Sequence, residues 1–378
     1  MPQNNYFIGL MSGTSADGVD AALIKMNQQN INQQHIELID FISEPLPAEL
    51  KQNLIALNTK PVMHLQHLAL LQKQVADIFS QTTLTLLKKN HLKPEQITAI
   101  GSHGQTIYHA PEIPMSIQIG HPAFIAKTTG ITTVGDFRID DMALGGQGAP
   151  FAPVFHHQLF ANNSPTFVIN IGGIANISCL NSNSESKEII GWDTGPGNAL
   201  MDDVCQKQLG IQYDPSGQNA SQGKINLKLL EHLLTHPYFK LKAPKSTGRE
   251  TFHTDWVDTL LTEKNIKINT HDLLATLCEL TAKTIAQQIQ ILDISTAVKT
   301  PTWIVGGGAY NDFLISRIQA HLPDCTVASS FQKGINPDAI EAMMFAWLAQ
   351  QRIENNPIDL AKVTGAKRNG VLGAIWHS

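Results

Sequence analysis

The feature that most constrains the fold of this chain is an order of elements that occurs twice. Each half runs as a hairpin, a third strand, a helical region and a further strand that ends in glycine. Repeated organisation indicates duplicated structural units more strongly than any single motif does. The expected strands span residues 6–10, 19–26, 35–42, 97–101 and 130–134 in the first half, and 166–172, 174–180, 188–192 and 302–305 in the second.

Apolar residues at three- and four-residue spacing predict the long helices between these strands. Those from Leu65 to Leu86 fall on one helical face, and those from Leu274 to Leu292 fall on another. Strands that alternate with such helices are typical of an α/β fold. The repeat therefore predicts two related α/β domains, at residues 1–164 and 165–378, with a cleft between them.

Composition agrees with two globular domains and argues against several classes of protein. The 378 residues are 42% hydrophobic and 16% charged, as in ordinary folded domains. The net charge of -5 argues against nucleic acid or an anionic membrane as the main partner. No apolar run approaches the ~20 residues of a membrane span, and the N-terminus lacks the basic region of a signal peptide. Cys179, Cys205, Cys278 and Cys325 form no CxxC pair and predict buried, reduced thiols in a cytoplasmic protein.

The first hairpin holds more polar residues than its turn needs. Two residues such as Asn-Gly suffice for a hairpin, whereas IGLMSGTSADGVDAAL places seven small or polar residues between apolar runs. Backbone N–H groups of a glycine-rich turn can converge on an anion, and the hydroxyls of Ser12, Thr14 and Ser15 add donors. Asp17 or Asp20 can then reach a Mg²⁺ that carries the same anion. A decorated turn without a ligand is an equally favoured alternative, and a Walker loop is excluded because GxxxxGK[ST] is absent.

Two further glycine turns follow strands of the second half. Gly172 and Gly173 let a backbone turn approach an anion closely, although a Gly-Gly pair alone usually marks only a tight turn. In VGGGAYN, the glycines at 306–308 allow a flat ligand to lie against the backbone. The dinucleotide-binding alternative is disfavoured, because it needs GxGxxG in an early βαβ unit.

Three polar side chains are candidates for chemistry. Asp193 directly follows a strand in GWDTGPGN, where a carboxylate can act as a general base. The alternative of a helix cap is less favoured, because Asn198 stands at the expected helix start and can cap it. Arg138 in GDFRIDD suits a carboxylate or phosphate, but on the residues alone a salt bridge to Asp140 is favoured. His103 in GSHGQTIYH fits no zinc spacing and indicates a polar cleft lining.

Together these segments resemble the anhydro-N-acetylmuramic acid kinases, of the sugar-kinase, heat-shock-protein and actin superfamily. The resemblance runs through MSGTSADGVDAAL, GSHGQTIYH, GDFRIDDMALGGQGAP, NIGGIANIS, DTGPGNALMD, PKSTGRE, VGGGAYN and VTGA, and covers essentially the whole chain. It implies two ribonuclease H-like domains, of the actin and hexokinase type, around a central ATP cleft. Such kinases open the 1,6-anhydro bridge with water and phosphorylate the freed O6 from ATP with Mg²⁺, as cytoplasmic homodimers in peptidoglycan recycling.

The resemblance also implies a role for each segment. Asp193 is the catalytic base and Asp17 is the Mg²⁺ ligand. Arg138, Glu341 and His103 are candidates for contact with the sugar. The nucleotide-binding residues are Ser12, Gly13, Thr14, Ser15, Ala16, Asp17, Gly18 and Val19 in a first phosphate loop, Gly172 and Gly173 in a second, and Gly306, Gly307, Gly308 and Asn311 in an adenosine pocket.

Three other functions are open on the sequence. A plain sugar or carboxylate kinase needs a substrate hydroxyl, in place of water, beside Asp193. A glycosidase needs a second catalytic carboxylate and leaves the glycine turns unexplained. A non-enzymatic nucleotide switch hydrolyses ATP slowly without any sugar. ATP turnover measured with and without an anhydro sugar separates all of them.

Overall fold

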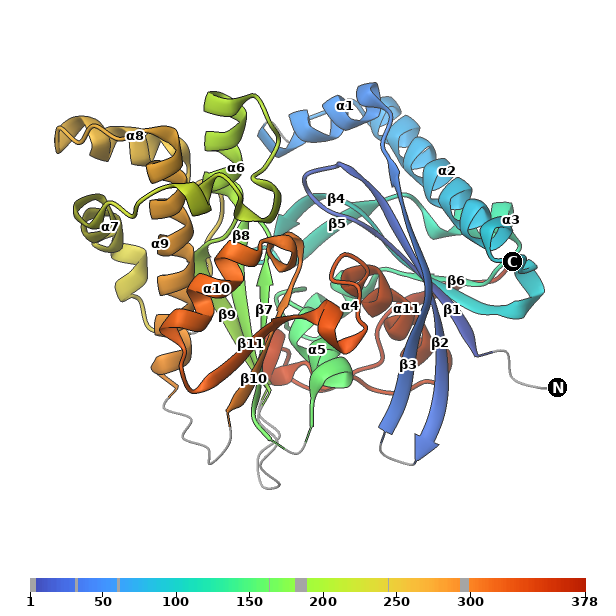
Figure 1. Ribbon diagram of the computed structural model, residues 1–378. Helices are drawn as coiled ribbons and strands as arrows, with labels where there is room; N and C mark the ends of the chain where they lie inside the picture. The colour runs from blue at the N-terminus through green and yellow to red at the C-terminus, as the bar shows by residue number, and fades with distance from the viewer. Residues whose placement is uncertain are drawn as a thin grey trace. The chain divides into compact units, whose positions relative to one another are not determined.

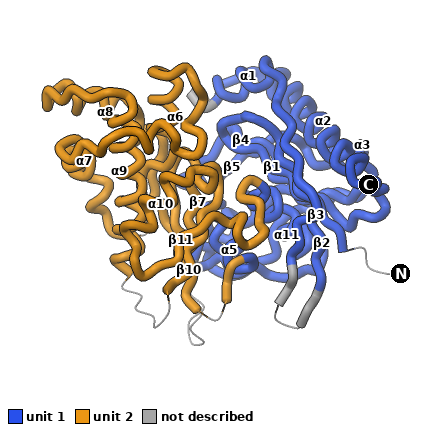
Figure 2. The backbone as a smooth tube through the Cα atoms, viewed as in Figure 1, with its two compact units in different colours: residues 1–159, 339–378 blue, residues 160–338 orange. Residues whose placement is uncertain are grey.

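The computed structural model describes residues 5–30, 33–59, 62–162, 164–180, 189–243, 245–292 and 299–378. The chain divides into two compact units, one of residues 1–159 with 339–378 and one of residues 160–338 (Figure 2). The sequence predicts residues 165–378 as one domain, but the last part of that range, from residue 339 on, clusters with the first unit.

The first unit is built on a mixed sheet in the order β12-β6-β4-β1-β2-β3 (Figure 1). Strand β2 is antiparallel to both β1 and β3, while β4 is parallel to both β1 and β6. The strands are β1 (Tyr6–Ser12), β2 (Gly18–Asn30), β3 (Gln33–Pro45), β4 (Ile97–Ala110), β5 (Met115–Ile119), β6 (Thr133–Gly135) and β12 (Ala374–Trp376). The α-helices are α1 (Ala48–Thr59), α2 (Leu65–Lys89), α3 (Pro122–Thr129), α4 (Phe137–Ala143), α5 (Ala152–Phe160), α11 (Ile340–Ile353) and α12 (Ala361–Thr364).

The second unit has a sheet in the order β11-β10-β7-β8-β9 (Figure 1). Its strands are β7 (Thr166–Ile171), β8 (Ile174–Leu180), β9 (Ile189–Pro196), β10 (Thr300–Val305) and β11 (Cys325–Ser329). Its α-helices are α6 (Ala199–Val204), α7 (Leu227–Leu234), α8 (Thr254–Glu263), α9 (Thr270–Gln290) and α10 (Asp312–His321). Glu188, the first residue of the strand expected at 188–192, lies outside the described residues.

The two sheets share one topology. The order β3-β2-β1-β4-β6 in the first unit matches β9-β8-β7-β10-β11 in the second. The directions match as well, because β7, β8 and β9 pair antiparallel and β10 is parallel to both β7 and β11. Three antiparallel strands followed by parallel ones form the ribonuclease H-like sheet, so the prediction of two related α/β domains is confirmed.

Hydrophobic periodicity located the long helices correctly but misplaced one strand. The helices expected at 65–86 and 274–292 are α2 and α9. The strand expected at 130–134 begins only at Thr133, because Gly130 ends helix α3 in a left-handed conformation with φ +71°. Glycine adopts this conformation at no steric cost and commonly terminates helices.

Helix α11 explains why the end of the chain belongs to the first unit. Nearly all its side chains are buried, and it packs on β1 and β4. A Cβ on Gly9 of β1 would lie 1.7 Å from the carbonyl oxygen of Ala342, and one on Gly101 of β4 would lie 1.8 Å from that of Phe345. Only glycine permits such close approach of a helix backbone to two neighbouring strands.

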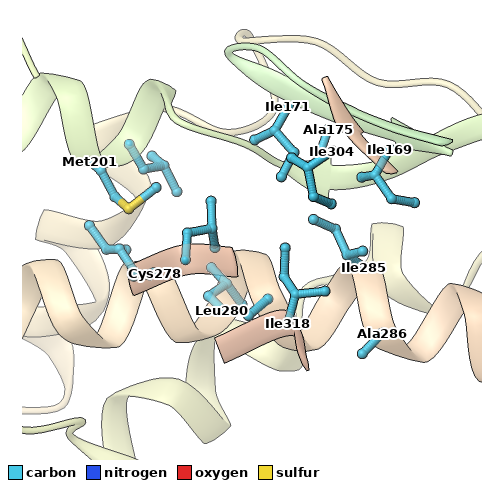
Figure 3. Close-up of a cluster of buried hydrophobic side chains, with 14 of the residues drawn as sticks. Ile169, Ile171, Ala175, Met201, Cys278, Leu280, Ile285, Ala286, Ile304 and Ile318 are labelled. Atoms are coloured by element: carbon cyan, nitrogen blue, oxygen red, sulfur yellow. The ribbon is translucent and has the colours of Figure 1, made fainter. Parts of the chain in front are cut away.

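The core of the second unit joins its hairpin to helix α9. Ile169, Ile171 and Ala175 of the hairpin and Cys278 and Ile285 of α9 are almost completely buried in one cluster (Figure 3). Burying one large aliphatic side chain contributes about 1.5–3 kcal/mol. The cluster therefore fixes the position of the β7–β8 turn, which lies at the end of these strands.

Candidate functional site

The turn between β1 and β2 is braced from beneath by buried polar groups. Ser12 Oγ lies 2.8 Å from the carbonyl oxygen of Gly18 and 2.7 Å from Oε1 of Gln105. The Gln105 amide donates to the carbonyl of Gly13 at 3.0 Å. Ser12 is 1% exposed, so its hydroxyl holds the turn together and does not face outward.

Only part of the predicted first phosphate loop presents side chains to solvent. Thr14, Ser15 and Asp17 are exposed, whereas Ala16 and Val19 are buried. Ala16 adopts a left-handed conformation with φ +52°, which is uncommon for a residue other than glycine. Strain of this kind concentrates at ligand-binding turns.

A cavity of about 510 Å³ opens beside this turn, within the first unit. Gly13, Asp17, Asp20 and Glu341 contribute to its wall, which brings Glu341 together with the predicted phosphate loop. Glu341 is exposed at the cavity. The surrounding protein raises the pKa of its carboxyl, the positive charge of Arg138 lowers it, and the negative charge of Asp20 raises it further.

Arg138 and His103 contact each other directly. Arg138 Nε donates to His103 Nε2 at 2.9 Å, and a second guanidinium nitrogen donates to the carbonyl of Gly148 at 2.7 Å. Burial lowers the pKa of His103 well below its usual range and Arg138 lowers it further, so the imidazole is neutral and can accept this bond. The salt bridge to Asp140 is not formed, and the Asp140 carboxylate accepts from the backbone N–H of Gly373 at 2.8 Å instead.

In the second unit, the Gly172–Gly173 turn is tied to the start of helix α6. The backbone N–H groups of Gly197 and Asn198 donate to the carbonyls of Gly173 and Gly172 at 2.9 and 2.8 Å. The Asn198 amide donates to the carbonyl of Ile171 at 3.1 Å and does not cap α6, contrary to the sequence prediction. Asn198 therefore fixes the turn by both its backbone and its side chain.

The glycines at 306–308 pack against the end of β7. A Cβ on Gly306 would lie 2.3 Å from Oδ1 of Asn170, and one on Gly308 would lie 2.4 Å from Cβ of Ile171. The two glycine turns of this unit therefore meet at the end of one strand. Asn311 is 8% exposed and accepts from the N–H of Leu314 at 2.9 Å as the cap of α10, so it orders the turn from behind.

Asp193 lies on β9 and its carboxylate is oriented by the segment that follows Pro244. Its Oδ2 accepts from Ser246 Oγ at 3.0 Å and from the backbone N–H of Thr247 at 2.9 Å. Among the described residues no hydrogen bond to Oδ1 accompanies these two. Burial raises the pKa of Asp193, and the bonds from Thr247 and Ser246 partly oppose the rise. The side chain holds no helix end, and a carboxylate with one oriented and one open oxygen suits a general base.

The donors present fit a Mg²⁺ that is held mainly by phosphates. The described parts of the chain contain no group of three or more His, Cys, Asp or Glu side chains that could hold a metal by itself. Asp17 is exposed and pairs with Lys51 Nζ at 2.6 Å, and Asp17 and Asp20 both line the cavity. Mg²⁺ typically takes one or two carboxylates and completes its shell with phosphate oxygens and water.

Helix length and the state of the cysteines are two further features of the structure. Within the described ranges, no helix combines the length and the apolar character needed to cross a bilayer. The four cysteines are free and buried, as predicted. Burial raises the pKa of Cys179 to about 11 and that of Cys205 to about 12, so both stay protonated at neutral pH.

Comparison with known proteins gives one consistent result. A family model described as "Anhydro-N-acetylmuramic acid kinase" matches residues 5–378. A protein of that name from Hydrogenovibrio crunogenus is 49% identical over 376 residues, which cover 100% of this chain and 99% of the relative. Proteins of the same name from Vibrio cholerae and Coxiella burnetii are 45% and 44% identical, again over 100% of this chain and over 100% and 98% of their own lengths.

Proposed function

The chain belongs to the anhydro-N-acetylmuramic acid kinase family, and from that premise we propose that it uses water to open the 1,6-anhydro bridge of anhydro-N-acetylmuramic acid. The same reaction transfers the terminal phosphoryl group of ATP to O6. The products are N-acetylmuramic acid 6-phosphate and ADP.

The observation that carries this proposal is the environment of Asp193. Ser246 and Thr247 hold one carboxylate oxygen, and the other accepts no hydrogen bond from the described residues. Burial makes the carboxylate a stronger base than an exposed aspartate. Such a group can take a proton from a water molecule, which a simple phosphate-binding protein has no need to do.

The proposed reaction is one connected sequence of bond changes. Asp193 accepts a proton from water while the water oxygen bonds to the anomeric carbon. The bond from that carbon to O6 breaks, and the electron pair stays on O6. O6 then bonds to the terminal phosphorus of ATP as ADP leaves, so no separate acid is needed to protonate O6.

The phosphate chain of ATP is assigned to the two hairpin turns. In the first unit, the backbone of Gly13 with Thr14 and Ser15 would contact it. In the second unit, Gly172 and Gly173 would do so, and the glycines at 306–308 would form the adenosine side. Asp17 and Asp20 would hold Mg²⁺, which when bound offsets the negative charge of the transferring group.

Arg138, His103 and Glu341 are assigned to the sugar. Arg138 and His103 are already joined by a 2.9 Å hydrogen bond, so they would act as one polar unit. The planar guanidinium of Arg138 suits a carboxylate, and the lactyl group of a muramic acid carries one. Following the family, we also propose that the protein is cytoplasmic and forms a homodimer. Light scattering tests the proposed dimer.

Reaction in ¹⁸O-labelled water tests the proposed chemistry. Label is expected on O1 of the product and none in the phosphate, and proton NMR before mutarotation should show the α anomer if the bridge occupied the β face. Label in the phosphate would show that ATP is hydrolysed separately. A β anomer at early times would indicate a covalent sugar intermediate on an enzyme carboxylate.

A further inference from the structure

The segment 245–250, within the PKSTGRE motif, has no role in the reaction as described so far beyond its contacts to Asp193. Hydrogen bonds and a ring contact hold this part of the chain next to Asp193. The backbone N–H of Asp193 donates to the carbonyl of Lys245 at 3.0 Å, and the Tyr238 hydroxyl donates to the carbonyl of Asp193 at 2.7 Å. Lys245 Nζ in turn lies 4.7 Å from the centre of the Tyr238 ring. These contacts fix where the rest of the segment runs.

Arg249, near the end of this segment, lies against Gly173 of the predicted second phosphate loop. A Cβ on Gly173 would lie 2.8 Å from Nε, 3.2 Å from Nη2 and 3.4 Å from Cζ of Arg249. The guanidinium therefore occupies the space that a side chain at position 173 would need. At Gly172 the nearest atom to such a Cβ is the Ile174 carbonyl oxygen, at 3.8 Å, so the close approach is specific to one glycine of the turn.

The Arg249 side chain is exposed and has donors to offer. Among the described residues it forms no side-chain hydrogen bond and no ion pair within 4.0 Å, and its charge lowers the pKa of Asp202. A guanidinium carries five donors in a planar fork that matches phosphate geometry. Its contact with Gly173 places those donors beside whatever the turn binds.

We propose that Arg249 donates hydrogen bonds to the terminal phosphate of ATP at the Gly172–Gly173 turn. The inference rests on the proposed function, because that function puts a phosphate chain at this turn. We assign Arg249 to the terminal phosphate because Thr247, two residues before Arg249, donates a hydrogen bond to Asp193, the proposed base. The segment therefore leads from Asp193 to the Gly172–Gly173 turn. Of the phosphates at this turn, the one nearest to Asp193 is the terminal phosphate, which is transferred to the sugar.

The test compares nucleotides that differ only in the terminal phosphate. Titration with ADP and with the β,γ-imido analogue of ATP, both with Mg²⁺, is carried out on wild type, Arg249→Ala and Arg249→Lys. Arg249→Ala should weaken the imido analogue about 10- to 100-fold, the worth of a charge-assisted hydrogen bond, and leave ADP within about 2-fold. Its kcat should fall by about 10²-fold, as when one transition-state donor is removed. Arg249→Lys should recover part of both losses.

Lys242→Ala is the matched control, because it removes one positive charge from an exposed position just before the same segment. It should change neither nucleotide affinity nor kcat. Equal weakening of both nucleotides by Arg249→Ala, or no weakening of the imido analogue, would overturn the assignment. A lowered melting temperature with unchanged nucleotide preference would also overturn it, since that result marks a structural role. If the wild type phosphorylates no anhydro sugar, the proposed function fails, and the titration still decides the role of Arg249.

Discussion

The two units place a turn at the same point of the same sheet topology but equip it differently. Residues 13–17 join β1 to β2 and carry exposed hydroxyls and a carboxylate, and a cavity lies beside them. Gly172 and Gly173 alone join β7 to β8 and have no side chains, and Arg249 from a distant segment lies against Gly173. A long turn can supply its own polar groups, whereas a short one must be given them by another part of the chain. The same fold thus obtains polar groups at this turn in two ways, from the turn itself in the first unit and from a distant segment in the second.

The register of the sheets extends this comparison to the carboxylates. Asp20 of β2 stands opposite Ser43 of β3, and at the corresponding point of the second unit Asn176 of β8 stands opposite Asp193 of β9. Each unit thus has one carboxylate at this level of its sheet, but on different strands. We assign metal binding to Asp20 and proton abstraction to Asp193, so substitutions at the two positions should have different effects.

The largest effect is expected for Asp193→Asn. The amide keeps the size of the side chain and loses the basic oxygen, so kcat should fall about 10²- to 10⁴-fold while ADP binding is retained. Asp20→Asn is the matched substitution in the first unit, and there added Mg²⁺ should restore part of the activity. Steady-state kinetics at several Mg²⁺ concentrations measure both. An Asp193→Asn protein with more than about a tenth of wild-type kcat would move the base elsewhere, with Asp136 and Glu341 to be tested next.

A smaller effect is expected from substitutions within the first turn. A Cβ on Gly13 would have Ser15 Oγ as its nearest neighbour, at 3.8 Å, so Gly13→Val should fold and lose ATP affinity only by blocking the approach of phosphate. Asp17→Ala removes a pair with Lys51 that is exposed and worth about 0–1 kcal/mol, so its melting temperature should hardly change. Extra Mg²⁺ should partly rescue ATP use by Asp17→Ala and should not rescue Gly13→Val. Equal rescue of both would refute the assignment of this turn.

The smallest effect concerns stability beside the second turn. Burial raises the pKa of Asp202 to about 6, partly opposed by Arg249. At pH 8 the folded protein must hold this carboxylate ionised against its preference, and below about pH 6 it is protonated. Asp202→Asn should therefore raise the free energy of unfolding by about 1–3 kcal/mol at pH 8 and by less at pH 5. Urea unfolding at the two pH values measures this gain.

Asp203→Asn is the comparison for that measurement, because it removes the same formal charge from the same helix. Since the Asp203 charge also raises the pKa of Asp202, this substitution should give a smaller gain of the same sign. A gain for Asp202→Asn that is equal at pH 5 and pH 8 would show that the carboxylate is not the cause. If Asp202→Asn raises the free energy of unfolding at pH 8 and also lowers activity, the Asp202 charge destabilises the fold but is needed for activity.

Features carried by local sequence could be predicted, and features that depend on distant residues could not. The hairpins and the long helices follow from periodicity and from glycine placement, whereas Asp193, expected directly after a strand, lies within β9. Helix α3 was missed because its eight residues are too few to show a clear period. The capping of α10 by Asn311 is not predicted from the sequence, and the contact of Arg249 with Gly173 joins segments that no local pattern relates.

The packing of α11 on Gly9 and Gly101 has a consequence for synthesis of the chain. Residues 160–338 are continuous, so a growing polypeptide can complete the second unit as soon as it has been made. The first unit begins with the first strand and is finished by a helix near the end of the chain. Domains generally fold as units during synthesis. The N-terminal strands must therefore wait, with the glycine faces of β1 and β4 uncovered, until residues 340–353 have been synthesised, so the unit that is begun first is completed last.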